Sequence, residues 1–305
     1  MRPKEGQSTV TPTRTDHEER LSRPATIRSI QLGETKVSFA PDGAVQGKPL
    51  DWLPDTTEQT WSANPQYLDA SGHVVASIGA LLVEHGGRAL LIDAGFGPQS
   101  MPADPASPNG VIYGGSLLDS LSELGRRPED IEAVAFTHLH PDHIGWAWHP
   151  GPGSDRPVFT AAEYLVAERE WAHRDLLEAG GTTAEIAASL APRVRTVTDR
   201  QEIFPGVEVQ IADGHTAGHV RYVITGGDTR LIAFGDALHS PIQVDHPEWS
   251  CVYDHDRIRA TEHRRRLLAE LEEPDTIGFG NHFADVVFGR VRRDGDGPSW
   301  RPLDT

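Results

Sequence analysis

The chain of 305 residues contains 37% hydrophobic and 24% charged residues, a composition that suits a globular protein with a sizeable core. Its formal net charge of −17 argues against a general nucleic-acid or anionic-membrane binder, because both functions need a basic surface. The single cysteine, Cys251, cannot form an internal disulfide, and no apolar stretch approaches the ~20 residues of a membrane span. The residues after Met1 lack the features of a secretory signal, so we expect a cytoplasmic protein.

The two ends of the chain differ in composition from the middle. Residues 1–25 are rich in Thr, Arg, Glu and Pro and lack apolar periodicity, so we expect a disordered N-terminal arm. Residues 26–291 carry alternating strand and helix patterns and are expected to form one domain. Residues 292–305 are expected to form a weakly ordered C-terminal tail.

Strand-like and helical patterns alternate along the expected domain. An apolar strand is expected at residues 89–92, a helix at 117–124, and a second strand at 131–136. Thr160 and Glu163 form a capping box that predicts a helix. The remaining expected elements are strands at 207–211, 222–225, 231–234 and 276–279 and a helix at 258–271. Periodicity alone therefore indicates a mixed α and β fold.

A dense group of potential metal ligands follows the strand expected at 131–136. The segment from His138 to His143 has the pattern His-x-His-x-Asp-His, and imidazole and carboxylate are ligands that Zn²⁺ prefers. In an extended segment the side chains of His138 and His140 point the same way, so both can reach one metal ion. Asp142 and His143 lie beyond Pro141, which implies a turn, and can serve a second metal ion. Solvated surface histidines are the alternative, which this density of ligands disfavours.

The chain resembles the metallo-β-lactamase fold superfamily over about residues 27–290. The resemblance rests on five motifs in the expected order, each after a plausible strand: residues 91–95 with Asp93, 138–143, 214–219 with His215, 234–236 with Asp236, and 280–282 with His282. It implies an α/β (α+β) protein with a four-layer αββα sandwich and a site at one edge between its halves. Asp93 would support the site without touching metal.

The resemblance also implies a two-metal site. The implied ligands are His138, His140 and His215 for the first ion, Asp142, His143 and His282 for the second, and Asp236 as a bridge. We expect two Zn²⁺ ions per chain, with Fe or Mn as alternatives, because the ligand types do not separate these metals. A hydroxide between the ions would hydrolyse an ester-like bond, since metal coordination lowers the pKa of water to about 7.

Three residues are expected to take part in catalysis: Asp142, Asp236 and His239. Asp236 would also lie where a leaving group collects a proton. His239 resembles a polar residue that lactonase-like and organophosphate-hydrolase-like relatives place near the substrate oxygen, and a plain loop histidine is the alternative. His219 is expected to support the site without binding metal.

Four aromatic residues flank the motifs: Phe96, Trp146, Trp148 and Phe283. They can wall an apolar pocket, and core packing is the alternative for each.

The motifs narrow the activity within the superfamily. Asp236 disfavours β-lactam hydrolysis, because β-lactamases of this fold lack the bridging carboxylate. Too few residues follow His282 for the helical domain of glutathione-thioester hydrolases, and the acidic composition disfavours nucleases. These comparisons leave the branch that contains N-acyl homoserine lactonase-like and methyl parathion hydrolase-like proteins, and residues 235–243 most resemble the methyl parathion hydrolase-like proteins. We expect a hydrolase of a small-molecule ester, such as a lactone or aryl ester, with no nucleic-acid or membrane partner.

Two questions stay open at this stage. A mononuclear iron oxygenase of the same fold is the alternative activity, and metal identity would distinguish it from a hydrolase. The oligomeric state is not determined, and a homodimer is one option.

Overall fold

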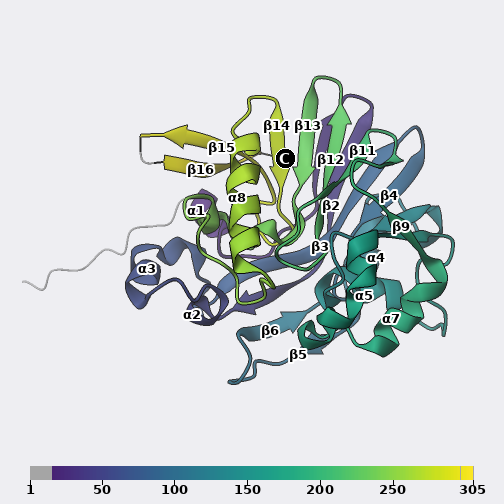
Figure 1. Ribbon diagram of the computed structural model, residues 1–305, viewed down its shortest axis with the longest axis horizontal. Helices are drawn as coiled ribbons and strands as arrows, with labels where there is room; N and C mark the ends of the chain where they lie inside the picture. Colours follow the sequence, from purple (N-terminus) through teal and green to yellow (C-terminus); the bar gives the residue numbers. More distant parts are fainter. Residues whose placement is uncertain (1–15, 296, 305) are drawn as a thin grey trace, which may run out of the picture.

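Two β-sheets pack face to face in the centre of the protein, and helices cover the outer faces (Figure 1). The computed structural model describes residues 16–295 and 297–304. Strands up to residue 197 form the first sheet, and strands between residues 202 and 302 form the second. Each half of the chain therefore contributes one sheet.

Within the described residues, the first sheet has nine strands in the order β5-β6-β2-β3-β4-β7-β8-β9, with β1 paired to β2. The strands β4, β7, β8 and β9 are parallel, so their carboxyl ends meet at one edge. The bounds are β1 (Arg28–Leu32), β2 (Thr35–Gly47), β3 (Val74–His85), β4 (Arg88–Ile92), β5 (Ser100–Met101), β6 (Asn109–Tyr113), β7 (Ala133–Ala135), β8 (Glu163–Ala167) and β9 (Val194–Val197).

The second sheet has seven strands in the described part of the chain, and they follow one another in sequence order from β10 to β16. Only β13 and β14 among them are parallel neighbours, so the loops that follow these two strands lie at the same edge. The bounds are β10 (Glu202–Phe204), β11 (Val207–Ile211), β12 (Val220–Gly226), β13 (Thr229–Ala233), β14 (Thr276–Phe279), β15 (Phe288–Asp294) and β16 (Gly297–Pro302).

Short helices connect the strands, and one longer helix, α8, lies on the second sheet (Figure 1). The α-helices are α1 (Asp16–Arg20), α2 (Pro49–Trp52), α3 (Glu58–Ala63), α4 (Leu117–Glu123), α5 (Pro141–Trp148), α6 (Glu168–Ala172), α7 (Ala184–Leu190) and α8 (Arg257–Leu271). Among the helices of the described residues, none has the length and apolar character that crossing a bilayer requires.

The alternation of side chains along the strands explains the layers. In β3, Leu81 and Val83 belong to the core between the sheets, whereas Ala80 and Leu82 belong to the core beneath the helices of the first sheet. Both faces of these strands are buried, and the strands are therefore apolar throughout.

Helices complete the two outer layers. On the first sheet, α4 contributes Leu117 and Leu121 to the core, and α5 contributes Ile144. On the second sheet, α8 contributes Leu267 and Leu271. The predicted four-layer αββα sandwich is confirmed.

One predicted helix is wrong. The capping box at Thr160 and Glu163 precedes the strand β8 and not a helix, and the helix α6 begins only at Glu168. Tyr164 and Leu165 are fully buried on opposite faces of β8, which pairs with β7. Burial on both faces therefore outweighs the local capping signal.

Both ends of the described chain are more ordered than their composition predicts. Residues 16–25 of the expected disordered arm include α1 and the buried Leu21, whereas residues 1–15 lie outside the described residues. The expected C-terminal tail forms an antiparallel hairpin of β15 and β16, in which Trp300 packs on Phe283 with ring centroids 4.9 Å apart. Both segments become ordered through contacts with residues that are distant in the sequence, and composition does not reveal such contacts.

The burial of Trp300 generates a stability prediction. Trp300→Ala should lower the free energy of unfolding by about 3–5 kcal/mol, because it removes a large buried ring from the core on the second sheet. Urea unfolding measures this change. Ile258→Ala is the control, since Ile258 is 74% exposed and its loss should cost less than about 0.5 kcal/mol. Equal stability of the two variants would show that the hairpin does not contribute to the core.

Candidate metal centre

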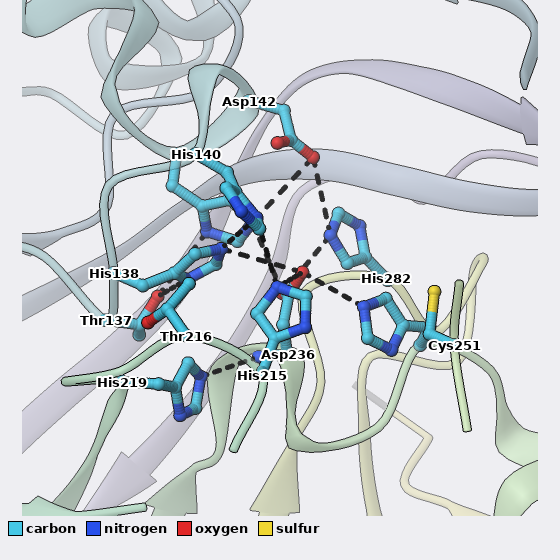
Figure 2. A network of polar contacts seen from close by, with 12 residues as sticks. Thr137, His138, His140, Asp142, His215, Thr216, His219, Asp236, Cys251 and His282 are labelled. Atoms are coloured by element: carbon cyan, nitrogen blue, oxygen red, sulfur yellow. Dashed lines mark hydrogen bonds and ion pairs between the residues drawn. The ribbon is translucent and has the colours of Figure 1, made fainter. Parts of the chain in front are cut away.

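The seven side chains predicted to bind metal converge at the edge of the sandwich where strands of both sheets end (Figure 2). His138 and His140 follow β7, Asp142 and His143 lie in the first turn of α5, His215 lies between β11 and β12, Asp236 lies in a 3₁₀ turn (Gly235–Ala237) after β13, and His282 follows β14. The fold therefore brings together every residue of the predicted ligand set.

The segment after β7 enters a helix instead of the turn predicted from Pro141. Pro141 occupies the first position of α5, where its missing N–H costs no hydrogen bond. His140 precedes it in an extended conformation, and His138 Nε2 lies 3.0 Å from His140 Nδ1, as the spacing predicts. Gly145 lies within this helix, and only glycine fits there because a Cβ would lie 2.0 Å from the Phe96 carbonyl carbon.

The first ligand group contains three imidazoles and a carboxylate. His140 Nδ1 lies 3.0 Å from His138 Nε2 and 3.1 Å from His215 Nε2. Asp236 Oδ2 lies 3.4 Å from His215 Nε2 and 3.8 Å from His138 Nε2. Two ligands of a tetrahedral ion, each at about 2.1 Å from it, lie about 3.4 Å apart. The spacing of this group therefore fits one ion.

The second ligand group contains Asp142, His143 and His282. Asp142 Oδ2 lies 3.5 Å from His282 Nε2 and 3.7 Å from His143 Nε2. Asp236 Oδ1 lies 3.3 and 3.2 Å from the same two nitrogens. Asp236 thus directs one oxygen toward each ligand group.

The donor set fits divalent cations better than it fits a closed hydrogen-bond network. Within the described part of the chain, the buried atoms His143 Nε2 and Asp236 Oδ1 lie 3.2 Å apart without hydrogen-bond geometry, and neither has another hydrogen-bond partner. Leaving such groups unsatisfied costs about 1–3 kcal/mol each. Burial, reinforced by the charge of His215, lowers the pKa of His140 to about 3, so its ring is neutral and keeps a lone pair for a cation.

Hydrogen bonds from outside the ligand groups orient three of the histidine rings. Each Nδ1 donates outward and leaves Nε2 toward the centre: His143 to Asp93 Oδ2 at 2.9 Å, His215 to Asp254 Oδ1 at 3.1 Å, and His282 to the Ser77 carbonyl at 2.8 Å. Burial opposes the ionisation of Asp254, but the hydrogen bond from His215 and the charge of Arg264 lower its pKa to about 2. Asp93 has the supporting position predicted for it.

Glu170 joins two of the ligand loops, and sequence reasoning missed it. Its Oε1 accepts from the Leu139 amide at 3.1 Å, and its Oε2 accepts from Thr216 Oγ1 at 2.7 Å and the Gly218 amide at 2.9 Å. Leu139 separates two ligand histidines, and Thr216 follows a third. Burial raises the pKa of Glu170. No motif marks an acidic residue in a short helix, so only the folded chain reveals this connection.

His219 holds the backbone of Asp236 (Figure 2). Its Nε2 accepts a hydrogen bond from the Asp236 amide at 3.0 Å, and its Nδ1 donates to the Ala212 carbonyl at 3.0 Å. Both ring nitrogens are therefore engaged away from the two ligand groups. Burial, together with the charge of His215, lowers the pKa of His219 to about 3, so the ring is neutral.

His239 lies beside Asp236 and borders the cavity that opens onto the candidate centre. Its Nε2 lies 3.2 Å from Asp236 Oδ2, and its ring lies outside both ligand groups. Burial opposes its protonation, but Cys251 and Asp236 raise its pKa well above the ordinary value. This position differs from that of an exposed loop histidine, because the side chain is buried and faces both the carboxylate and the cavity.

The cavity has a volume of about 450 Å³, and aromatic side chains form part of its wall. Phe96 and Trp148 line it, as predicted. Trp52 and Tyr253 also line it, and sequence reasoning missed both, because they lie far from the ligand motifs or in a loop without a recognisable pattern.

The other two aromatic residues considered for the wall are core residues. Trp146 is 2% exposed, and its Nε1 donates to Asp42 Oδ1 at 2.8 Å. Phe283 is fully buried in the core on the second sheet, where its ring centroid lies 5.2 Å from that of Phe234. For these two positions, the alternative of core packing is the correct one.

The class of protein follows from the family comparison. A family model described as the metallo-beta-lactamase superfamily matches residues 77–280, which is more than half of the chain. The chain therefore belongs to this superfamily and is a hydrolase of it, as the motifs predict.

Individual relatives agree with this class. A probable metallo-hydrolase of Mycobacterium tuberculosis is 24% identical over 235 residues, covering 68% of this chain and 74% of the relative. The N-acyl homoserine lactonase AiiB of Agrobacterium fabrum is 30% identical over 155 residues, covering 46% of this chain and 55% of that protein. The structure of AidC, a dizinc quorum-quenching lactonase with a bound product, matches with a TM-score of 0.76 at 24% identity, covering 94% and 99% of the two chains.

The buried neutral histidines generate a prediction for the metal-free protein. His140 and His219 have pKa values of about 3 when folded and about 6.5 when unfolded, so below pH 6.5 the unfolded chain binds more protons than the folded one. Stability should therefore fall as the pH decreases from 6.5 toward 3, by up to about 1.4 kcal/mol per pH unit for each ring.

Urea unfolding in the presence of a chelator, at several values of pH below 6.5, tests this dependence. His219→Gln can keep both hydrogen bonds but cannot titrate. The slope of its unfolding free energy against pH should therefore be smaller than that of the wild type by up to about 1.4 kcal/mol per pH unit, which corresponds to one proton. An unchanged slope would mean that His219 is not held neutral.

Proposed function

We propose that the protein is a dinuclear metal-dependent hydrolase of neutral esters, such as lactones or aryl esters, that carry an apolar substituent. The observation that carries this proposal is the position of Asp236, because its two oxygens face two separate ligand groups. The assigned ligands are His138, His140 and His215 for one ion, Asp142, His143 and His282 for the other, and Asp236 for both. Zn²⁺ is the expected metal, with Fe or Mn as alternatives.

The bound ions would supply an activated water and a polarised substrate oxygen, since coordination lowers the pKa of water to about 7. The protein's own residues do the rest. In this proposal, Asp236 supplies negative charge between two cation positions, accepts a proton and passes it to the leaving group. His239 Nε2, 3.2 Å from Asp236 Oδ2, can donate a hydrogen bond to the substrate oxygen. Asp142 also lines the cavity.

The cavity supports a neutral substrate with an apolar group. Its apolar lining includes Trp52, Phe96, Ile112 and Trp148, and three carboxylates also face it, those of Asp104, Asp142 and Asp236. Among the described residues that line it, none is lysine or arginine. A polyanion such as RNA would meet these carboxylates without a basic partner. The names of AiiB and AidC as lactonases support the same substrate class.

Metal content and the bridge can be tested together. Elemental analysis of metal-replete protein should give about two Zn²⁺ per chain. Asp236→Asn keeps the shape but removes the charge that offsets two dications, so we expect weaker occupancy of at least one site and a kcat loss of about 10²-fold or more. Wild-type turnover with two fully occupied sites in this variant would refute the bridge. One iron per chain with oxygen consumption would favour the iron oxygenase instead.

Substrate class can be tested with a panel of lactones, aryl esters, thioesters, phosphotriesters and RNA. We expect hydrolysis of lactones or aryl esters with apolar substituents and no cleavage of RNA. Cleavage of RNA without cleavage of esters would overturn the substrate class while leaving the metal site intact.

The role of His239 has its own test. His239→Ala should lower kcat by about 10²-fold or more without releasing metal, because His239 is assigned to the substrate and not to an ion. His246→Ala is the control, because the His246 side chain is 42% exposed and does not line the cavity, and this variant should keep wild-type turnover. Loss of metal from His239→Ala, measured by elemental analysis, would show that His239 is a ligand.

A further inference from the structure

Three arginines near the N-terminus surround one buried carboxylate. Arg23 donates two hydrogen bonds to Asp285 Oδ2, at 3.0 and 2.8 Å, and Arg28 donates to both carboxylate oxygens at 2.7 to 3.2 Å. Arg20 donates to the Asp285 backbone carbonyl at 3.0 and 2.7 Å, and its Nε lies 3.7 Å from Oδ2. The Asp285 side chain is fully buried. We call these four residues the arginine clamp.

Asp285, the carboxylate of the arginine clamp, lies three residues after the candidate ligand His282. The segment between them turns sharply, since Ala284 has a φ of +45°, a conformation that a residue with a Cβ rarely adopts. Such a conformation persists only where surrounding contacts determine it. The clamp supplies these contacts from one side, because the Asp285 amide also donates to the Arg20 carbonyl at 3.0 Å.

Ser77 connects the same N-terminal segment to the His282 ring. Ser77 Oγ accepts from the Ala25 amide at 2.7 Å and donates to the Ala284 carbonyl at 3.0 Å. The Ser77 carbonyl accepts from His282 Nδ1 at 2.8 Å and so fixes which ring nitrogen faces the centre. Residues 20–28 therefore hold both the loop that carries His282 and the acceptor that orients its ring.

We propose that the arginine clamp is a positioning device for His282 and thereby for the second metal site alone. This inference rests on the two-metal centre of the proposed function. The clamp contacts the His282 loop, whereas Glu170 ties together the loops of His138, His140 and His215. Loss of the clamp should therefore weaken the site of Asp142, His143 and His282. The site of His138, His140 and His215 should stay intact. A clamp that only stabilised the fold would not distinguish the two sites.

Zn²⁺ titration of metal-free protein against a chromogenic chelator measures both sites. The wild type should bind two ions. Asp285→Asn preserves the shape but removes the charge that the arginines pair with, so we expect about 10–100-fold weaker binding of one ion, and the other should stay within about twofold. Glu272→Gln is the matched control. Glu272 accepts two hydrogen bonds from Arg293, at 2.6 and 3.2 Å, and this exposed pair lies away from the centre. This variant should bind both ions as the wild type does.

A second variant covers the case in which Asp285→Asn does not fold. Arg23 is 48% exposed in its side chain, so Arg23→Ala removes one arm of the clamp with less risk to the core, and it should weaken the same ion by a smaller factor. Arg23→Lys keeps the charge but not the two-pronged geometry and should recover part of the loss. The gain in melting temperature on adding Zn²⁺ should shrink in the variants in the order of their metal affinities.

The outcomes separate the clamp from the centre. A wild-type protein that binds fewer than two ions would overturn the two-metal centre and the clamp's role with it. A wild type with two ions, and clamp variants that keep both affinities while melting earlier with and without metal, would show that the clamp only stabilises the fold. Equal weakening of both sites would also overturn the proposal.

Discussion

The two carboxylate oxygens of Asp236 face different groups of imidazoles, and the rest of the centre is arranged around this one side chain. Its backbone must be held for this to occur. His219 Nε2 accepts a hydrogen bond from the Asp236 amide, and Gly235, which precedes Asp236, has a φ of +52°. A Cβ on Gly235 would lie 2.6 Å from His219 Nε2 and 2.9 Å from Thr137 Cβ. Glycine is therefore required at position 235, because a side chain there would collide with His219 and Thr137.

Burial makes the orientation of each ligand expensive to change. Imidazoles and carboxylates lose hydration when they are packed at this edge, so each needs a partner on the side that faces away from the centre. Asp93, Asp254 and the Ser77 carbonyl provide these partners for three rings. Asp254 is itself buried and is compensated by Arg264 at 2.9 Å. The ligands thus depend on a layer of fixed hydrogen bonds, which restricts the ring nitrogens that remain available to a cation.

The edge of the sandwich combines parts of the chain that are remote in sequence. β7 belongs to the first sheet and β13 and β14 to the second, and the loops after all three carry candidate ligands. The N-terminal segment crosses from the first sheet to the His282 loop, where its arginines neutralise Asp285. The segment that composition predicts to be loose is therefore part of the wall behind the second ligand group.

The sequence by itself determined the superfamily, six of the strands and the set of candidate ligands. His138 to His143 lie within six consecutive residues, and buried strands require apolar residues on both faces, so both signals are local. Glu170, Asp254, the arginine clamp and the distinction between Trp146 and Trp148 were decided only by the tertiary structure. These positions depend on partners 10 to 265 residues away, and no local pattern encodes which distant carbonyl, amide or guanidinium a buried side chain will meet. The same reason explains the capping box at Thr160, where burial of the following residues between two cores outweighed the local signal for a helix.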